Sequence, residues 1–230
     1  MALPILHIFA AVLDSYVLWY DQAYINIPFE KGLDTYPFRS RVLFLTLWNF
    51  VLHAVYFWIA FANDIFGTND ASPRNPPLIR KVKDTLFSLA FPVGIYVSIA
   101  FWGIYAVDKD LIFPDHMEKA FPPWINHSLH TFVSLFIMLE MLTSDITYPC
   151  RNLGIVVFKL FSFSYIIFIF VVFNQTGKWV YPVLAHLNWP LRISYLMGSH
   201  VLALVFYFLG EILNRKLNLS TKVKANKKSR

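Results

Sequence analysis

The sequence predicts an all-α membrane protein, a polytopic bundle of six transmembrane helices with both termini in the cytosol. Of its 230 residues, 57% are hydrophobic and only 15% are charged, and the mean hydropathy is +0.51. A soluble domain of this length carries more charge on its surface. The 23 phenylalanines and seven tryptophans suit lipid contact and the membrane interfaces. The expected environment of the chain is therefore a lipid bilayer.

Six stretches meet or approach the length of about 20 apolar residues that a helix needs to cross about 30 Å of hydrocarbon. They are 4–20, 41–62, 85–107, 125–143, 154–173 and 190–213. The first is short and contains His7 and Asp14, so a signal peptide competes with it, but no basic n-region or cleavage site is present. Pro92 is expected to kink the third stretch. Residues 1–214 thus form a transmembrane domain, and residues 215–230 a basic tail.

The basic residues predict the orientation of the bundle. Twelve of the 20 Lys and Arg residues lie in the segments 63–84 and 144–153 and in the tail after Asn214, whereas seven lie in the other loops. Cytosolic loops carry the excess of Lys and Arg, which places both termini in the cytosol. The second and fourth helices then begin at the non-cytosolic side.

Charge, cysteine count and motifs exclude several functions. Seven basic residues follow Asn214, so the net charge of +6 indicates a membrane-surface tail and no nucleic-acid partner is expected. The single cysteine, Cys150, excludes an internal disulfide. The chain lacks a G-x-S-x-G elbow, an H-E-x-x-H motif and a Gly-rich phosphate loop.

Two helices carry polar stripes at helical spacing, and such stripes turn toward a bundle interior or a water-filled cavity. Thr46 and His130 each lie five residues past the start of their helix, about 7 Å deep at 1.5 Å per residue. The two side chains therefore share one depth near the outer leaflet. The stripes consist of Thr46, Asn49 and His53 in the second helix, and of His127, His130 and Ser134 in the fourth.

A hydroxyl beside an imidazole is a minimal activated nucleophile, and in a pocket open to lipid it favours hydrolysis of a lipid ester. A zinc-dependent enzyme is a second possibility, with His127 and His130 as ligands and His53, Asp14 or Glu140 completing the site. A lipid-binding or transport protein without catalysis is a third. Interhelical hydrogen bonding alone would also account for single members of the stripes.

Several stretches resemble the family of the androgen-induced gene 1 protein and the androgen-dependent TFPI-regulating protein. They run through five of the six predicted helices, and only the first helix resembles the family loosely. The stretches are "FLTLWNFVL" (44–52), "LAFPVGIYVSIAFWGIYAVDKDLIFP" (89–114), "PWINHSLHTF" (123–132), "TGKWVYP" (176–182) and "LGEILN" (209–214).

The resemblance implies hydrolysis of fatty acid esters of hydroxy fatty acids. No metal or organic cofactor is expected for this reaction, and the expected location is the plasma membrane or the endoplasmic reticulum. The resemblance also implies Thr46 as the nucleophile and His130 as the base. His127 is then a pocket wall that orients His130 or the substrate.

Further residues are candidates for substrate binding or for supporting the site. Three of them could donate to the oxyanion, and an arginine could pair with the free carboxylate of the substrate. The oxyanion candidates are Asn49, His127 and Trp179, the carboxylate partner is Arg41 or Arg39, and His53 and Ser134 complete the polar stripes.

Overall fold

The computed structural model describes residues 2–71 and 73–228, and these residues form helices and loops without strands. Six spans within them are long and apolar enough to cross a membrane, which confirms the predicted class. The spans are α1 (Ala2–Tyr24), α2 (Leu45–Phe66), α3 (Leu78–Val107), α5 (Pro123–His127) with η3 (Ser128–Phe132) and α6 (Val133–Thr143), α7 (Arg151–Thr176) and α9 (Trp189–Lys228). The short connecting helices are η1 (Arg41–Leu43), η2 (Lys109–Leu111), α4 (Asp115–Glu118) and α8 (Pro182–His186).

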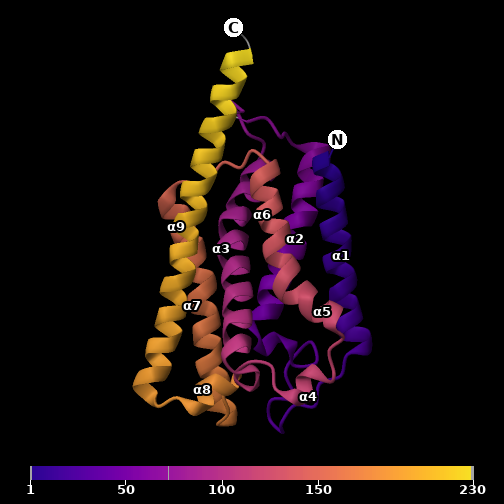
Figure 1. Cartoon of the computed structure of the whole chain (residues 1–230), viewed down its shortest axis with the longest axis vertical. Helices are drawn as coiled ribbons and strands as arrows, with labels where there is room; N and C mark the ends of the chain where they lie inside the picture. The colour runs from indigo at the N-terminus through magenta and orange to yellow at the C-terminus, as the bar shows by residue number, and fades with distance from the viewer. Residues whose placement is uncertain (1, 72, 229–230) are drawn as a thin grey trace.

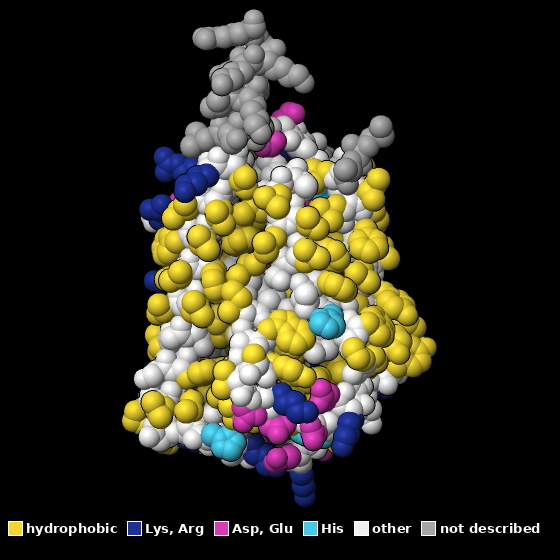
Figure 2. Space-filling model, in the orientation of Figure 1, with side chains coloured by type: hydrophobic (Ala, Val, Ile, Leu, Met, Phe, Trp, Pro, Cys, Tyr) yellow, Lys and Arg dark blue, Asp and Glu magenta, His cyan; other side chains and the backbone are white. Residues whose placement is uncertain are grey.

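Helix α3 is the centre of the bundle. It packs against α2 and α6 on one side and against α7 and α9 on the other, while α1 lies along α2 (Figure 1). The start of α1 and the end of α9 lie at the same end of the molecule (Figure 1). Hydrophobic side chains cover the middle of the face in Figure 2, and charged side chains gather at its lower end. The molecule is an integral multi-pass membrane protein.

Among the differences between the observed and predicted helix boundaries, three bear on the architecture. Helix α2 begins at Leu45 rather than residue 41, because Phe44 is extended (φ −97°, ψ 134°) and the residues before it form η1. Helix α3 begins at Leu78 rather than residue 85 and continues through Pro92. Helix α9 runs to Lys228, so the predicted tail from residue 215 continues the helix, and its last two residues lie outside the described part.

A buried polar network joins four helices at the end where the termini lie. His7 of α1 hydrogen-bonds Asp64 of α2 and Glu140 of α6, each at 2.7 Å. Tyr56 donates to Glu140 at 2.7 Å, and the Lys83 ammonium lies 3.4 Å from the same carboxylate. Buried charges require such partners. Helix α1 is therefore fixed in the bundle by buried hydrogen bonds to two carboxylates as well as by apolar packing.

We expect the end of the bundle that carries this network to face the cytosol. The reason is the excess of Lys and Arg in the segments at that end. A C-terminal tag should therefore bind antibody only after cells are permeabilised. A tag introduced in the outer loop at Asp34, an exposed residue, serves as the matched control and should be labelled in intact cells. The opposite pattern would invert the orientation.

Candidate active site

The fourth span contains a π-helical turn at the predicted histidine. Residues Ser128–Phe132 form this turn between α5 and α6, and it places His130 in the bundle, only 6% exposed. Phe101 of α3 stacks on the His130 ring with 3.6 Å between centroids and 7° between planes. The indole N–H of Trp102 donates to the His130 carbonyl at 3.2 Å. Single π turns inside α-helices recur at functional sites, and here α3 holds the turn in place.

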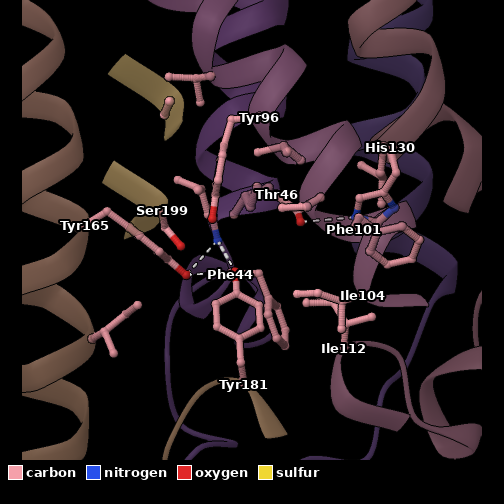
Figure 3. A pocket seen from close by; sticks show the side chains of 18 of the residues that line it. Phe44, Thr46, Tyr96, Phe101, Ile104, Ile112, His130, Tyr165, Tyr181 and Ser199 are labelled. Carbon is pink, nitrogen blue, oxygen red and sulfur yellow. Dashed lines mark hydrogen bonds between the residues drawn. The ribbon is translucent and has the colours of Figure 1, made fainter. Parts of the chain in front are cut away.

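Asn126 fixes the tautomer of His130. The Nδ1 atom of His130 lies 2.8 Å from Oδ1 of Asn126 and 3.1 Å from its backbone oxygen. A carbonyl oxygen only accepts, so Nδ1 carries the proton and donates. The other ring nitrogen, Nε2, is then an acceptor, and it lies 3.2 Å from the hydroxyl oxygen of Thr46. The three side chains form a hydroxyl–imidazole–amide series, shown in part in Figure 3.

Thr46 is the second residue of α2, so its hydroxyl lies at a helix N-terminus. The first backbone N–H groups of a helix have no acceptor within the helix, and the helix dipole is positive there. Negative charge that develops on an atom bound to Thr46 would lie close to these N–H groups. The position therefore suits a nucleophile whose reaction passes through an oxyanion.

The loop before α2 is held in an unusual conformation. Phe38, Arg39 and Ser40 have positive φ angles of 53°, 49° and 64°. For residues other than glycine the left-handed conformation costs about 1–2 kcal/mol each. Contacts at the end of the loop offset this cost: Arg39 donates to the Ile25 carbonyl, and Arg41 donates to Asp21 at 3.0 Å. The strained residues lie immediately before η1, and their conformation sets the direction in which the chain enters η1 and then α2, the helix that carries Thr46.

A cavity of about 170 Å³ opens beside the Thr46–His130 pair, and its walls are almost entirely apolar. It extends from Arg41, at the end of the bundle opposite the termini, past Phe101, to Ala203 between α3, α7 and α9. Helices α3 and α7 contribute more side chains to its lining than any other element, and most of these are aliphatic or aromatic. Such a cavity fits hydrocarbon chains, with the hydroxyl–imidazole pair as a polar group on its wall.

Tyrosine hydroxyls line the cavity next to Thr46 (Figure 3). The Leu45 N–H donates to Tyr165 at 2.8 Å and to Tyr181 at 3.0 Å, and Tyr165 in turn donates to the Leu43 carbonyl at 2.9 Å. The Tyr181 proton is thus left to bind either the Tyr165 oxygen, at 3.0 Å, or a group in the cavity. Burial raises the pKa of Tyr181 to about 12, so this hydroxyl keeps its proton at neutral pH.

The structure does not bring the other members of the two polar stripes to the cavity. His127 is exposed, stacks on Trp102 at 5.2 Å and hydrogen-bonds Thr131 at 3.1 Å. The Ser134 hydroxyl donates to the Thr131 carbonyl. Because a π turn separates them, His127 and His130 do not share the face that a regular α-helix predicts.

Asn49 and His53 are fully buried between α2 and α3. His53 Nε2 lies 3.3 Å from the Ala90 carbonyl, and Gly94 leaves the room for its ring, since a Cβ there would lie 2.6 Å from that nitrogen. The amide of Asn49 has no hydrogen-bond partner among the described residues. Both residues therefore belong to the helix–helix packing rather than to the cavity wall.

Arg41 and Trp179 lie in the connections before α2 and after α7. Arg41 lines the cavity, but its guanidinium is only 5% exposed and pairs with Asp21, so a substrate carboxylate would have to compete with this aspartate. Burial lowers the pKa of Arg41, and the Asp21 carboxylate opposes that shift. Trp179 stacks on Phe173 at 4.1 Å and carries Arg192 over its ring at 4.9 Å, outside the cavity.

The proposed zinc ligands are dispersed in the structure. The ring nitrogens of His130 face Thr46 and Asn126, His127 lies on the other side of the π turn, and Glu140 belongs to the distant network with His7. Within the described residues no group of three His, Cys, Asp or Glu side chains is placed to hold a metal ion. The described geometry thus offers no zinc centre built on these two histidines.

The fold and the site define a polytopic helical membrane protein in which a threonine–histidine pair faces a mostly apolar cavity. The chain belongs to the FAR-17a/AIG1-like protein family, whose model matches residues 3–215. It is 37% identical to the androgen-induced gene 1 protein of Homo sapiens, over 74% of this chain and 75% of that protein. It is 35% identical to the androgen-dependent TFPI-regulating protein of Rattus norvegicus, over 80% of both. No solved structure matches the chain.

Asn126 was not among the residues predicted from the sequence, and its role is testable. Asn126→Ala removes the side-chain acceptor of the imidazole and leaves only the backbone carbonyl, and we expect kcat for the ester hydrolysis proposed below to fall about 10- to 100-fold with little change in KM. Asn126→Asp keeps an acceptor for Nδ1 and should retain more activity than the alanine variant. Asn188→Ala, on the connection to α9, is the matched control. Equal activity of Asn126→Ala and wild type would remove Asn126 from the site.

Proposed function

We propose that the protein is a membrane-embedded esterase that hydrolyses fatty acid esters of hydroxy fatty acids. The observation that carries the proposal is the 3.2 Å contact between the Thr46 hydroxyl and His130 Nε2 on the wall of an apolar cavity. A hydroxyl becomes nucleophilic when a base within about 2.6–3.2 Å accepts its proton. The resemblance of "FLTLWNFVL" and "PWINHSLHTF" to the family supports the same two residues and the substrate class.

In the first half of the reaction the Thr46 oxygen attacks the ester carbonyl carbon, and His130 Nε2 accepts the hydroxyl proton. The carbonyl electrons move to the oxygen, where the Thr46 N–H near the start of α2 and the Tyr181 hydroxyl would donate to the oxyanion. The intermediate collapses by breaking the bond to the ester oxygen. His130 gives its proton to that oxygen, and the hydroxy fatty acid leaves.

In the second half the acyl-threonine is hydrolysed. A water molecule gives a proton to His130 Nε2 as its oxygen attacks the acyl carbon. Collapse of this intermediate breaks the bond to Thr46, which takes the proton back from His130, and the fatty acid leaves. Asn126 holds the His130 imidazole in one orientation throughout, because Nδ1 of His130 retains its proton in both halves of the reaction.

The proposal is tested with purified protein, a branched fatty ester and a fluorophosphonate probe. Wild-type protein should release both acids, and the probe should label Thr46 but not the Thr46→Ala variant. A metal chelator is expected to leave turnover unchanged. Loss of turnover on chelation, restored by zinc, would favour the metalloenzyme instead. Purified, folded protein that neither hydrolyses the ester nor reacts with the probe would contradict the proposal.

A further inference from the structure

A second hydroxyl–imidazole pair lines the same cavity. Ser162 of α7 and His200 of α9 face each other, with 2.9 Å between Oγ and Nδ1. Phe163 stacks on the His200 ring at 4.6 Å, and His200 is only 7% exposed. The reaction at Thr46 uses neither residue. In an otherwise apolar cavity, this pair is a separate place where a polar group of a ligand could bind.

The two pairs lie at different depths along α3. Phe101 stacks on His130 beside Thr46, whereas Val93 and Val97 form a cluster with Phe158, whose ring is 5.5 Å from that of His200. Four to eight residues separate these positions on α3, about 6–12 Å at 1.5 Å per residue. A ligand that spans both pairs therefore has two polar groups separated by a short hydrocarbon segment.

The charge beside the second pair is positive. Lys159, an exposed residue, lies about one turn before Ser162 on α7. Among the described residues Lys159 has no carboxylate within ion-pair distance, in contrast to Arg41, which pairs with Asp21. An ammonium group without a counter-ion at the edge of a low-dielectric region favours an anionic ligand.

We propose that Ser162, His200 and Lys159 bind the free carboxylate of the substrate while its ester lies at Thr46. The inference rests on the proposed function and adds the selection rule: acidic esters are preferred over neutral ones. If Ser162 donates its proton to Nδ1, the other imidazole nitrogen of His200 carries a proton and donates to the carboxylate. Lys159 supplies the positive charge, and the apolar wall between the pairs contacts the intervening hydrocarbon.

The test compares a branched fatty ester as the free acid with the same ester whose carboxyl is methylated. Wild type should have a KM about tenfold lower for the acid, as expected for a charge-assisted hydrogen bond. Lys159→Met should raise KM for the acid about tenfold, while kcat and both constants for the methylated ester stay unchanged. Lys178→Met, which removes a cation from the outer loop where it pairs with Glu30, is the matched control and should behave as wild type.

Two results overturn this inference but leave the proposed function standing. One is equal KM for acid and methylated ester in wild type, and the other is an equal effect of Lys159→Met on both. Labelling of Ser162 by fluorophosphonate in the Thr46→Ala variant would identify a second nucleophile instead and also overturns it. If wild type hydrolyses neither ester, the test is the binding of a radiolabelled hydroxy fatty acid and of its methyl ester. A preference for the acid that is lost in Lys159→Met supports the carboxylate subsite. Equal binding of the two compounds to wild type overturns it.

Discussion

Replacing His130 with alanine is expected to lower kcat for ester hydrolysis by at least about 10³-fold in folded protein. His130 Nε2 is the acceptor placed at the Thr46 hydroxyl, and without it the hydroxyl stays protonated and weakly nucleophilic. Thr46→Ala should be equally inactive, because the two residues act as a unit. Turnover of both variants is measured at the same protein concentration as wild type, and size-exclusion chromatography verifies folding.

His127→Ala is the matched control for His130→Ala, since it removes an imidazole from the same segment but outside the cavity. It should keep most of its activity. Thr46→Ser should keep part of it, because the hydroxyl remains while the methyl group that restricts its rotamer is lost. An inactive His127→Ala beside an active His130→Ala would reverse the roles of the two histidines. Equal loss in both, with sensitivity to chelator, would indicate a metal site.

The fold was predictable because length and hydropathy constrain a membrane helix strongly. Each predicted apolar stretch corresponds to a membrane span in the structure, and the predicted helix ends were wrong where polar residues continue a helix. Arg80, Lys83 and Asp84 suggested a loop before residue 85, yet they are buried in α3 among their ion partners. The conformation of the connecting loops could not be predicted from hydropathy, and the three residues with a left-handed conformation before η1 are not the glycines that usually indicate one.

The contact between Thr46 and His130 was predictable, whereas the positions of the residues around it were less so. Equal depth brought Thr46 and His130 together correctly, because depth follows from residue count alone. The assignment of Asn49, His53 and His127 to one pocket assumed regular helices whose polar faces meet. The π turn places His127 outside the cavity, and the absence of a side chain at Gly94 lets the His53 ring pack against α3 instead. The signal for Asn126 was its position four residues before His130, one helical turn away.

Tyr181→Phe is expected to lower kcat about 10²-fold with little effect on KM, because it removes one donor to the oxyanion. The hydroxyl lies 3.0 Å from the Leu45 N–H at the start of α2, next to Thr46, and phenylalanine keeps the ring packing on Phe44. With a pKa raised to about 12 by burial, Tyr181 stays protonated up to strongly alkaline pH, so the loss should be constant between pH 6 and 9 rather than pH-dependent.

The control for Tyr181→Phe is Tyr36→Phe, whose hydroxyl donates to Gln175 at 2.9 Å on the exposed outer surface and which should be as active as wild type. Single-turnover kinetics with a branched fatty ester locate the defect. A donor to the oxyanion acts in both acylation and deacylation, so both rates should fall in Tyr181→Phe. A rise in KM without a change in kcat would assign Tyr181 to substrate binding. An unchanged kcat would leave the Thr46 N–H as the proposed oxyanion donor and exclude the tyrosine from catalysis.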